Sequence, residues 1–281
     1  MNSSLEGKYK ESIRNKRKIN WYNFSMSEDT LGIYCKELEN KFTKERADKT
    51  KPLLARLDGR AFHTYTKGLK RPYDERLSAC MIETTKALIE EFHPRIVYTQ
   101  SDEISLLFYA DPEYPTSCLP FDGRIQKLIG VLAGFASSVF ALQAYKNIPE
   151  KQEYTPHVDA RVWSVDTKED VVKTFIWRMI DAKKNSVSMA AQSVYSHKTL
   201  LNKGTNEKIG MLKEKGIDWY SYPNFFRVGS FFRRQTIDVL LTEEERNNIP
   251  EKYRPKEGTT VKRSKVLEDV PEKVTWDWLI K

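Results

Sequence analysis

Hydrophobic positions recur along the chain in two periods, and the order of these periods predicts a fold. Short β-branched or aromatic runs, typical of strands, lie at residues 52–58 (PLLARLD), 95–99 (RIVYT), 104–110 (ISLLFYA) and 157–163 (HVDARVW). Segments with an apolar residue at every third or fourth position, typical of helices, lie at residues 73–92 and 126–145. The order strand, helix, strand, strand, helix, strand is the split βαβ or ferredoxin-like pattern, so we expect an α+β fold.

Further helices and one further strand are expected on either side of this core. Residues 27–42 carry Leu31, Tyr34, Leu38 and Phe42 at helical spacing, and this stripe should pack on the main body. A long helix is predicted over 168–196, followed by a polar loop, a shorter helix and a last strand over 225–241. The stretch 126–145 is apolar nearly all round, which predicts a helix buried on more than one side.

Composition sets the class of protein. The chain has 281 residues, of which 40% are hydrophobic and 12% aromatic, and this is enough for a sizeable core. The N-terminus lacks the apolar segment of a secretory signal and we expect no membrane-spanning stretch, which favours a cytoplasmic protein with no membrane partner. Three widely spaced cysteines suggest neither a zinc site nor a disulfide framework. The net charge of +8 favours a polyanionic partner such as nucleic acid.

Three carboxylates stand at strand ends that the predicted topology brings together. Asp58 ends the first strand, and Asp102 and Glu103 lie in the QSDE segment between the second and third strands. The first and third strands of a split βαβ sheet are neighbours, so these carboxylates should converge. Carboxylates this close repel one another, and a bound divalent cation is the usual compensation for that repulsion. Hard oxygen ligands without histidine or cysteine favour Mg²⁺ as the cation.

The segment after Asp58 suits a phosphate. Gly59 allows close approach of its carbonyl to a metal, and the amides from Gly59 to His63 could cradle a phosphate. The alternative is that Asp58 and the SDE segment are ordinary polar turns. The histidines show no paired spacing, and only His63 lies in this loop. The mixture of aromatic residues and arginines over 224–234 favours a core strand over a base-stacking platform.

Several of these segments together resemble one enzyme family. RLDGRAFHTYTKGLKRPYDERL, YTQSDEISLLF, KLIGVLAGFASSVF, HVDARVW, SHKTLLNKGTNEKIGMLKEKGIDW and FFRVGSFFRR occur in the order found in the tRNA-His guanylyltransferase family, and the chain resembles its bacterial and phage branch most. The resemblance implies a polymerase-type palm that adds nucleotides to the 5′ end of tRNA by 3′–5′ synthesis. The 5′ phosphate is first activated by a nucleoside triphosphate, GTP or ATP, and the 3′-OH of an incoming nucleotide then attacks it.

The resemblance also assigns residues. Two Mg²⁺ ions would be held by Asp58, the Gly59 carbonyl, Asp102 and Glu103, of which the three carboxylates are the catalytic residues. The residues that it places against the nucleotide are Gly59, Arg60, Ala61, Phe62, His63, Arg71, Asp74, Arg76, Ser101, Arg124 and Lys127. Among these, Arg71 stands where the family usually has the lysine of a KPND element. RNA contacts are expected from Lys183, Asn185, His197, Lys198 and Arg227.

One segment departs from the family pattern. Eukaryotic members carry HINNLYNT after an aspartate that corresponds to Asp181, but this chain has AKKNSVSM, so Lys183 replaces the histidine and Asn185 is retained. This difference favours the branch that repairs truncated 5′ ends against a template. The family resemblance also suggests a homotetramer. We expect a basic N-terminal arm over 1–28, a catalytic domain over 29–242 (palm core about 52–165, C-terminal half 166–242) and a tail over 243–281.

Two other functions are compatible with the same residues. A nucleotide cyclase uses the same kind of palm and metal site but attacks with a different hydroxyl, and this chain lacks a GGDEF-type turn. A non-catalytic tRNA-binding protein on a decayed palm is the other alternative, which the presence of all three carboxylates disfavours.

Overall fold

The computed structural model describes residues 28–113 and 116–281, so the predicted basic arm lies almost wholly outside the described residues. The chain divides into two compact units, Met1–Lys44 and Glu45–Lys281. In the first unit, helix α2 (Glu28–Thr43) forms where the sequence predicts it. Tyr34, Leu38 and Phe42 of its apolar stripe are exposed, and the packing of this stripe on the main body stays a prediction.

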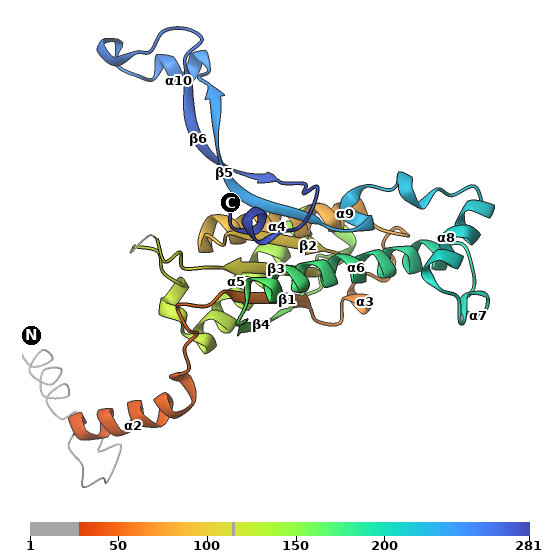
Figure 1. Ribbon diagram of the computed structural model, residues 1–281, viewed down its shortest axis with the longest axis horizontal. Coiled ribbons are helices and arrows are strands. Elements are labelled where there is room, and N and C mark those ends of the chain that lie inside the picture. Colours follow the sequence, from red (N-terminus) through yellow and green to blue (C-terminus); the bar gives the residue numbers. More distant parts are fainter. Residues whose placement is uncertain (1–27, 114–115) are drawn as a thin grey trace, which may run out of the picture. The chain divides into compact units, whose positions relative to one another are not determined.

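The second unit is built on an antiparallel sheet whose strands differ in length (Figure 1). Its central strands are β1 (Leu53–Gly59), β2 (Ile96–Gln100), β3 (Glu103–Phe108) and β4 (Val158–Ser164). Over the described residues the sheet has six strands in the order β4-β1-β3-β2-β5-β6, and neighbouring strands are antiparallel. The first four strands stand in the order 4-1-3-2 of a split βαβ unit, which confirms the predicted α+β fold.

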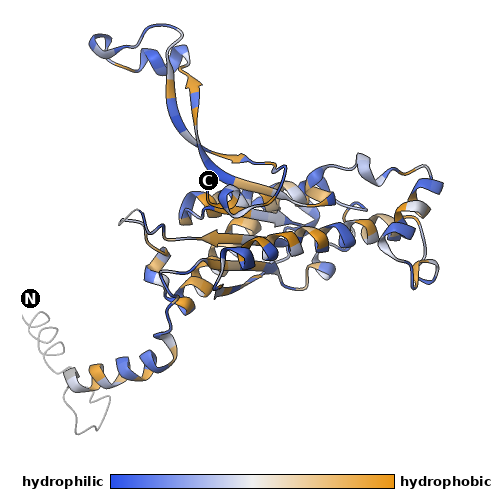
Figure 2. Cartoon of the chain, in the orientation of Figure 1, coloured by the Kyte–Doolittle hydropathy of each residue, from blue (hydrophilic) through white to orange (hydrophobic). Residues whose placement is uncertain are grey.

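Helices cover both faces of this sheet. On one face lie α4 (Glu75–Phe92) and α5 (Ile125–Asn147), which pack against alternate residues of β1, Leu53, Ala55 and Leu57. On the other face, residues Val171 and Phe175 of α6 (Lys168–Gln192) pack against Leu54 and Leu107. Successive strand residues point to opposite faces, so Arg56 and Asp58 share the α6 face with Leu54. Figure 2 shows the hydrophobic colour concentrated on the central strands and on α5.

Helix α5 differs from its prediction in two respects. Its buried residues form a single stripe, namely Leu128, Leu132, Ala136, Phe140 and Ala144, whereas Leu142 and Tyr145 are exposed. The expectation of burial on more than one side is therefore wrong for this chain on its own. The expectation that no stretch is long enough to span a bilayer is also wrong, because α5 is by length and composition apolar enough to cross a membrane. Length and composition alone do not distinguish a membrane-spanning helix from a helix of a protein core.

The segment after α6 contains several short elements. They are α7 (His197–Leu200), α8 (Thr205–Glu214), α9 (Asn224–Arg227) and β5 (Ser230–Leu240). The strand predicted over 225–241 is therefore wrong at its start. Pro223 precedes a single helical turn, and Gly229 at φ +80° separates that turn from β5.

The last forty residues contain regular secondary structure. Strand β6 (Thr260–Glu268) pairs with β5 along its whole length, and the two form a ribbon that projects beyond the sheet with α10 (Glu243–Asn247) near its far end (Figure 1). Helix α11 (Trp276–Ile280) returns to the α6 face, where Leu279 is fully buried. The described chain also contains the one-turn helix α3 (Phe62–Tyr65) and short 3₁₀ turns at Pro120–Gly123, Pro149–Lys151, Trp219–Ser221 and Glu251–Tyr253.

Candidate functional site

The predicted carboxylates meet where the central strands end, on the face of the sheet that α6 covers. Asp58 stands opposite Glu103 on β3 and opposite Asp159 on β4, which places a row of three acids across three strands. We call Asp159, Asp58 and Glu103 the acid row. Asp102 lies beside it in the turn between β2 and β3, and its carbonyl accepts a hydrogen bond of 3.1 Å from the Gly59 amide. Like charges this close raise the free energy of the site unless cations compensate them.

Arginines form the next row along the same strands. Arg161 on β4 stands opposite Arg56 on β1, two residues back from the acid row. The Arg161 guanidinium lies 3.6 Å from Asp159 and 4.0 Å from Asp58. Arg56 lies over the exposed ring of Trp177, 5.8 Å from its centroid. Arg161 thus compensates part of the charge of Asp159 and Asp58 from the next position along the strands.

Glu103 is paired with an arginine that the sequence analysis did not identify. Arg178 of α6 donates from Nε to Oε1 of Glu103 at 2.7 Å, and its Nη2 lies 2.6 Å from Oε2. Both side chains are nearly buried, at 11% exposure each. Burial raises the pKa of Glu103 and Arg178 offsets part of that rise. This two-pronged geometry is the strong form of an arginine–carboxylate pair.

Asp102 is in a different electrostatic position. Burial raises its pKa, and the neighbouring charge of Asp58 raises it further. A divalent cation between the two would relieve both effects. Asp58, Asp102 and Glu103 line one cavity of about 390 Å³, together with Gln100, Ser101, Arg178, Asn185, Ser188, Met189 and Gln192. We call this the acidic cavity.

The donors fit a magnesium ion that is shared with a phosphate. In the described part of the chain no group of three His, Cys, Asp or Glu side chains is close enough to hold a metal alone. Asp58 and Asp102 supply two carboxylates, and the Gly59 carbonyl adjoins them. Mg²⁺ is commonly bound by one or two carboxylates, with water and substrate phosphates completing its coordination. The set therefore fits Mg²⁺ with a triphosphate better than a metal held by protein alone.

A second cavity of about 380 Å³ adjoins the first and shares Gln100, Ser101, Asp102, Met189 and Gln192 with it. We call it the aromatic cavity, because Phe62, Tyr73, Phe225 and Phe226 line it. Among the predicted nucleotide-binding residues, His63, Arg71 and Asp74 also line it. Aromatic rings together with polar groups that can form hydrogen bonds suit a nucleobase, and the position of this cavity beside the acidic cavity suits a nucleotide that extends from one to the other.

The predicted phosphate loop keeps only part of its proposed donors. The Gly59 amide donates to Asp102 and the Arg60 amide donates to the His157 carbonyl at 2.8 Å. Ala61 has φ +56° and caps α3, so the amides of Ala61, Phe62 and His63 are those at the open N-terminus of that turn. The packing gives a further reason for a glycine at position 59, because an added Cβ would lie 2.3 Å from the Phe62 ring.

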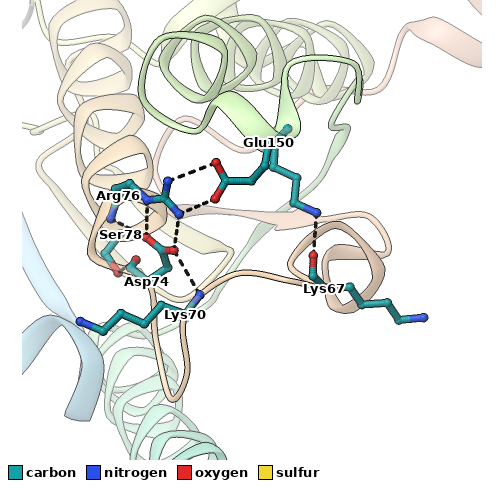
Figure 3. A network of polar contacts seen from close by, with 7 residues as sticks. Lys67, Lys70, Asp74, Arg76, Ser78 and Glu150 are labelled. Carbon is teal, nitrogen blue, oxygen red and sulfur yellow. Dashed lines mark hydrogen bonds and ion pairs between the residues drawn. The ribbon is translucent and has the colours of Figure 1, made fainter.

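Asp74 and Arg76 belong to a polar network in which Asp74 is buried and its partners Arg76 and Glu150 are exposed (Figure 3). Asp74 caps α4 and accepts bonds from the Arg76 side chain at 3.0 and 2.8 Å, and Arg76 in turn pairs with Glu150 at 2.6 Å. The hydrogen bond from Arg76 lowers the pKa of Asp74 to about 2. Lys70 donates its amide to Asp74, so this network fixes the loop that carries Arg71 into the aromatic cavity. Arg76 itself is not among the residues that line either cavity.

The other predicted residues are more dispersed. Arg124 donates to the Phe121 carbonyl and Lys127 lies over the Phe121 ring, and neither residue lines the acidic or the aromatic cavity. Asn185 reaches the acidic cavity and donates to Asp181 at 3.2 Å. Lys183 and Arg227 flank the buried Trp219 ring, at 5.9 and 5.5 Å from its centroid. His197 and Lys198 are the first two residues of α7, and neither lines the acidic or the aromatic cavity.

Sequence reasoning named Asn185 on α6 but missed the other residues that this helix contributes, and it missed β4. Arg178, Ser188, Met189 and Gln192 recur at helical spacing with Asn185, and all of them line the acidic cavity. This polar stripe on an otherwise core-facing helix was a visible signal. Asp159 and Arg161 alternate with the buried Ala160, a second signal that those two side chains share the face of Asp58.

Carboxylates at the ends of two adjacent central strands, beside a cavity fit for a nucleobase, are the arrangement used for nucleotidyl transfer. A family model described as tRNAHis guanylyltransferase matches residues 32–166. A solved bacterial tRNA(His) guanylyltransferase-like protein in complex with ATP is 32% identical, with a TM-score of 0.68 over 72% of this chain and 88% of that one. A bacterial structure of the same description in complex with GTP is 27% identical, with a TM-score of 0.65 over 85% of this chain and 91% of that one.

A relative of known name is also a tRNA(His) guanylyltransferase, and it matches over a smaller part of its own length. The tRNA(His) guanylyltransferase 1 of Arabidopsis thaliana is 27% identical over 192 residues, which are 63% of this chain and 33% of that protein. The chain belongs to the tRNA-His guanylyltransferase family, whose members are nucleotidyltransferases, and the resemblance seen in its sequence is confirmed.

Proposed function

We propose that this protein is a Mg²⁺-dependent nucleotidyltransferase that adds nucleotides to the 5′ end of tRNA in the 3′–5′ direction, as a repair activity directed by a template. The observation that carries the proposal is that Asp58 and Asp102 both line the acidic cavity, next to an aromatic cavity of nucleotide size. Family membership and the ATP and GTP complexes of the two bacterial relatives support it.

In this mechanism the residues act in three groups. Asp58, Asp102 and the Gly59 carbonyl would hold two Mg²⁺ ions, and bound Mg²⁺ would supply neutralisation of the triphosphate charge and activation of the attacking hydroxyl. The amides of Ala61, Phe62 and His63, together with Arg71, orient the phosphates. The aromatic cavity binds the base of the incoming nucleotide. The 3′-OH of that nucleotide attacks the activated 5′ phosphate of the RNA, and pyrophosphate or AMP leaves.

The direct test is extension of a tRNA that lacks its 5′-terminal nucleotide. The full chain with Mg²⁺ and labelled GTP or ATP should give products longer by one or more nucleotides at the 5′ end, and chelation of Mg²⁺ should stop the reaction. Asp58→Asn and Asp102→Asn should each lower the rate at least a hundredfold, because each removes a negative oxygen ligand. Full-length tRNA that stays unextended serves as the control for template direction.

No extension of any tRNA by the wild-type chain would contradict the proposed function. Formation of a cyclic nucleotide from the triphosphate alone would instead indicate the cyclase reaction. We further propose a homotetramer in the cytoplasm, in keeping with the family resemblance. The mass of the full chain in solution, measured by light scattering, tests the oligomeric state.

A further inference from the structure

Trp177 of α6 is exposed beside the acid row, although tryptophan is a large side chain that folding usually covers. Its exposed fraction is 53%, and Ile176 and Ile180 on the same helix are exposed as well. Residues three and four apart share a helix face, so Ile180 adjoins both of the other two. Single exposed apolar residues are ordinary, but an exposed group of this size indicates an interaction surface.

A pair of arginines lies on the sheet next to this ring. Arg56 on β1 stands directly opposite Arg161 on β4, and like charges in such a cross-strand pair repel. Arg161 is compensated by Asp58 at 4.0 Å and Asp159 at 3.6 Å. The buried Nε of Arg56, however, has no hydrogen-bond partner in the part of the chain that the structure describes. A phosphate bound beside the two arginines would offset their repulsion and provide an acceptor for Arg56.

The Trp177 ring keeps surface on which a flat group can lie. Arg178, which Glu103 and Asp181 hold in place, lies 4.4 Å from the ring centroid and supports the ring from its own helix. Arg56 lies at 5.8 Å, near the outer limit of about 6 Å for a cation over a ring, and more than half of the Trp177 side chain stays exposed. An exposed aromatic ring with arginines beside it is suited to stacking with a nucleobase.

This surface lies about one nucleotide from the carboxylates. Arg56 and Asp58 are two residues apart on the same face of β1, which is about 7 Å at about 3.4 Å per residue. Neither Trp177 nor Arg56 lines the aromatic cavity, which takes the base of the incoming nucleotide in the proposed function. The ring is therefore left for the other substrate, whose 5′ phosphate has to reach Asp58.

We propose that Trp177 is the stacking platform for the base at the 5′ end of the RNA that is extended, with a phosphate of that RNA beside Arg56. The end base of an RNA helix has one uncovered face, and proteins commonly cover such faces with aromatic side chains. The exposed Lys173 and Lys184 lie before and after Trp177 on α6 and add positive charge that suits a polyanion. The proposal rests on the proposed function for the identity of the RNA, but the platform can be tested without turnover.

The first experiment measures RNA binding in the absence of nucleoside triphosphate. The probe is a 5′-phosphorylated RNA hairpin that copies a tRNA acceptor arm without its first nucleotide, with 2-aminopurine as the 5′-terminal base and fluorescein in the loop. Fluorescein anisotropy gives the Kd of the full chain. Trp177→Ala and Trp177→Leu should each raise Kd by about fivefold to a hundredfold, the range for one lost base stack. Trp177→Tyr, which keeps a ring, should stay within about threefold of wild type.

Two comparisons separate stacking from packing and from general loss of binding. Saturating wild type should quench the 2-aminopurine emission, and saturating Trp177→Leu should not, because leucine fills space without offering a ring face. Tyr145→Ala is the matched control, since Tyr145 is also an exposed aromatic residue, at 59%, but lies on α5, which covers the other face of the sheet. This control should leave both Kd and quenching as in wild type. If Trp177→Ala does not fold by circular dichroism, the leucine and tyrosine variants carry the comparison.

The second experiment measures extension of the same hairpin without the two labels. Trp177→Leu should raise KM for the RNA at least fivefold and leave the Kd of labelled GTP within twofold of wild type, because Trp177 does not line the aromatic cavity. A folded Trp177→Leu chain with the RNA KM and the 2-aminopurine quenching of wild type would overturn the platform alone. A wild-type chain that binds the hairpin through Trp177 and extends no RNA would refute the proposed function and leave the platform standing. A wild-type chain that binds no hairpin would overturn both.

Discussion

Gly59 shows how one residue serves two neighbours at once. Its amide donates to Asp102 and so joins the end of β1 to the turn that carries the second carboxylate. Its missing side chain leaves room for Phe62, which is buried against Tyr65 and Phe140 at centroid distances of 5.1 and 5.2 Å. The sequence predicted that a glycine was needed here, but only the packed structure shows that an aromatic ring occupies the space.

Gly59→Ala is therefore expected to destabilise the protein by about 1–3 kcal/mol, the usual cost of inserting a methyl group into a packed site, since the ring of Phe62 must move. Urea denaturation at neutral pH measures the change. Gly134→Ala is the matched control, because an added Cβ on that helical glycine meets nothing within 4 Å and alanine favours a helix. If Gly59→Ala unfolds at the same urea concentration as wild type, Phe62 does not close over this position.

Asp74 makes a pH-dependent contribution to stability. Its pKa in the folded protein is about 2, compared with an ordinary value of 3.8, chiefly because of the Arg76 hydrogen bond. A lowered folded-state pKa stabilises the protein above the unfolded value and loses that contribution as the pH falls toward the folded one. At neutral pH, Asp74→Asn should thus lower the free energy of unfolding by about 2 kcal/mol.

The difference between wild type and Asp74→Asn should shrink between pH 4 and pH 2, and urea denaturation across that range measures it. Asp166→Asn is the control, since this exposed partner of Lys51 should change stability by less than about 0.5 kcal/mol at any pH. A difference that stayed constant down to pH 2 would show that the cap, and not the charge, carries the stabilisation.

The helices and strands that were predicted correctly are those whose own sequence is enough to specify them. Strands β1 to β4 and helices α4 and α5 appear within a few residues of their predicted bounds, because each has a clear period and a proline, aspartate or turn at its end. The meeting of Asp58 with Glu103 followed from topology alone, since the order of a split βαβ sheet fixes which strand ends adjoin.

Elements specified by distant partners were missed. Strand β6 has the sequence TVKRSKVLE, whose charges hide its alternation, and it becomes a strand because β5 provides a partner along nine residues. The same charges protect the free edge of the sheet, where lysine and arginine discourage pairing with another chain. Arg178 is a similar case, because nothing near it in the sequence indicates a contact with Glu103, 75 residues away.

For the whole molecule, the C-terminal residues belong to the cooperative core of the second unit. Leu279 is fully buried with Val171, Phe175 and Phe231, and Trp278 packs edge-on against Phe231 with ring centroids 5.0 Å apart. The segment that looked like a tail thus closes the α6 face of the same sheet whose other end carries the acid row. Unfolding of that segment should therefore unfold the site.

Leu279→Ala should lower the free energy of unfolding of the whole second unit by about 3 kcal/mol, in the range for a leucine removed from a packed core. Val270→Ala is the control, because Val270 is 67% exposed and should cost under about 0.5 kcal/mol. Urea denaturation followed by far-ultraviolet circular dichroism measures both, and binding of labelled GTP across the same transition reports the site. If residues 243–281 were an independent tail, Leu279→Ala would leave the main transition and the loss of GTP binding where they are in wild type. A single transition shifted for both signals would instead show that α11 and the acid row fold together, because the sheet that bears Asp58 and Glu103 is packed on one face by the helix that Leu279 supports.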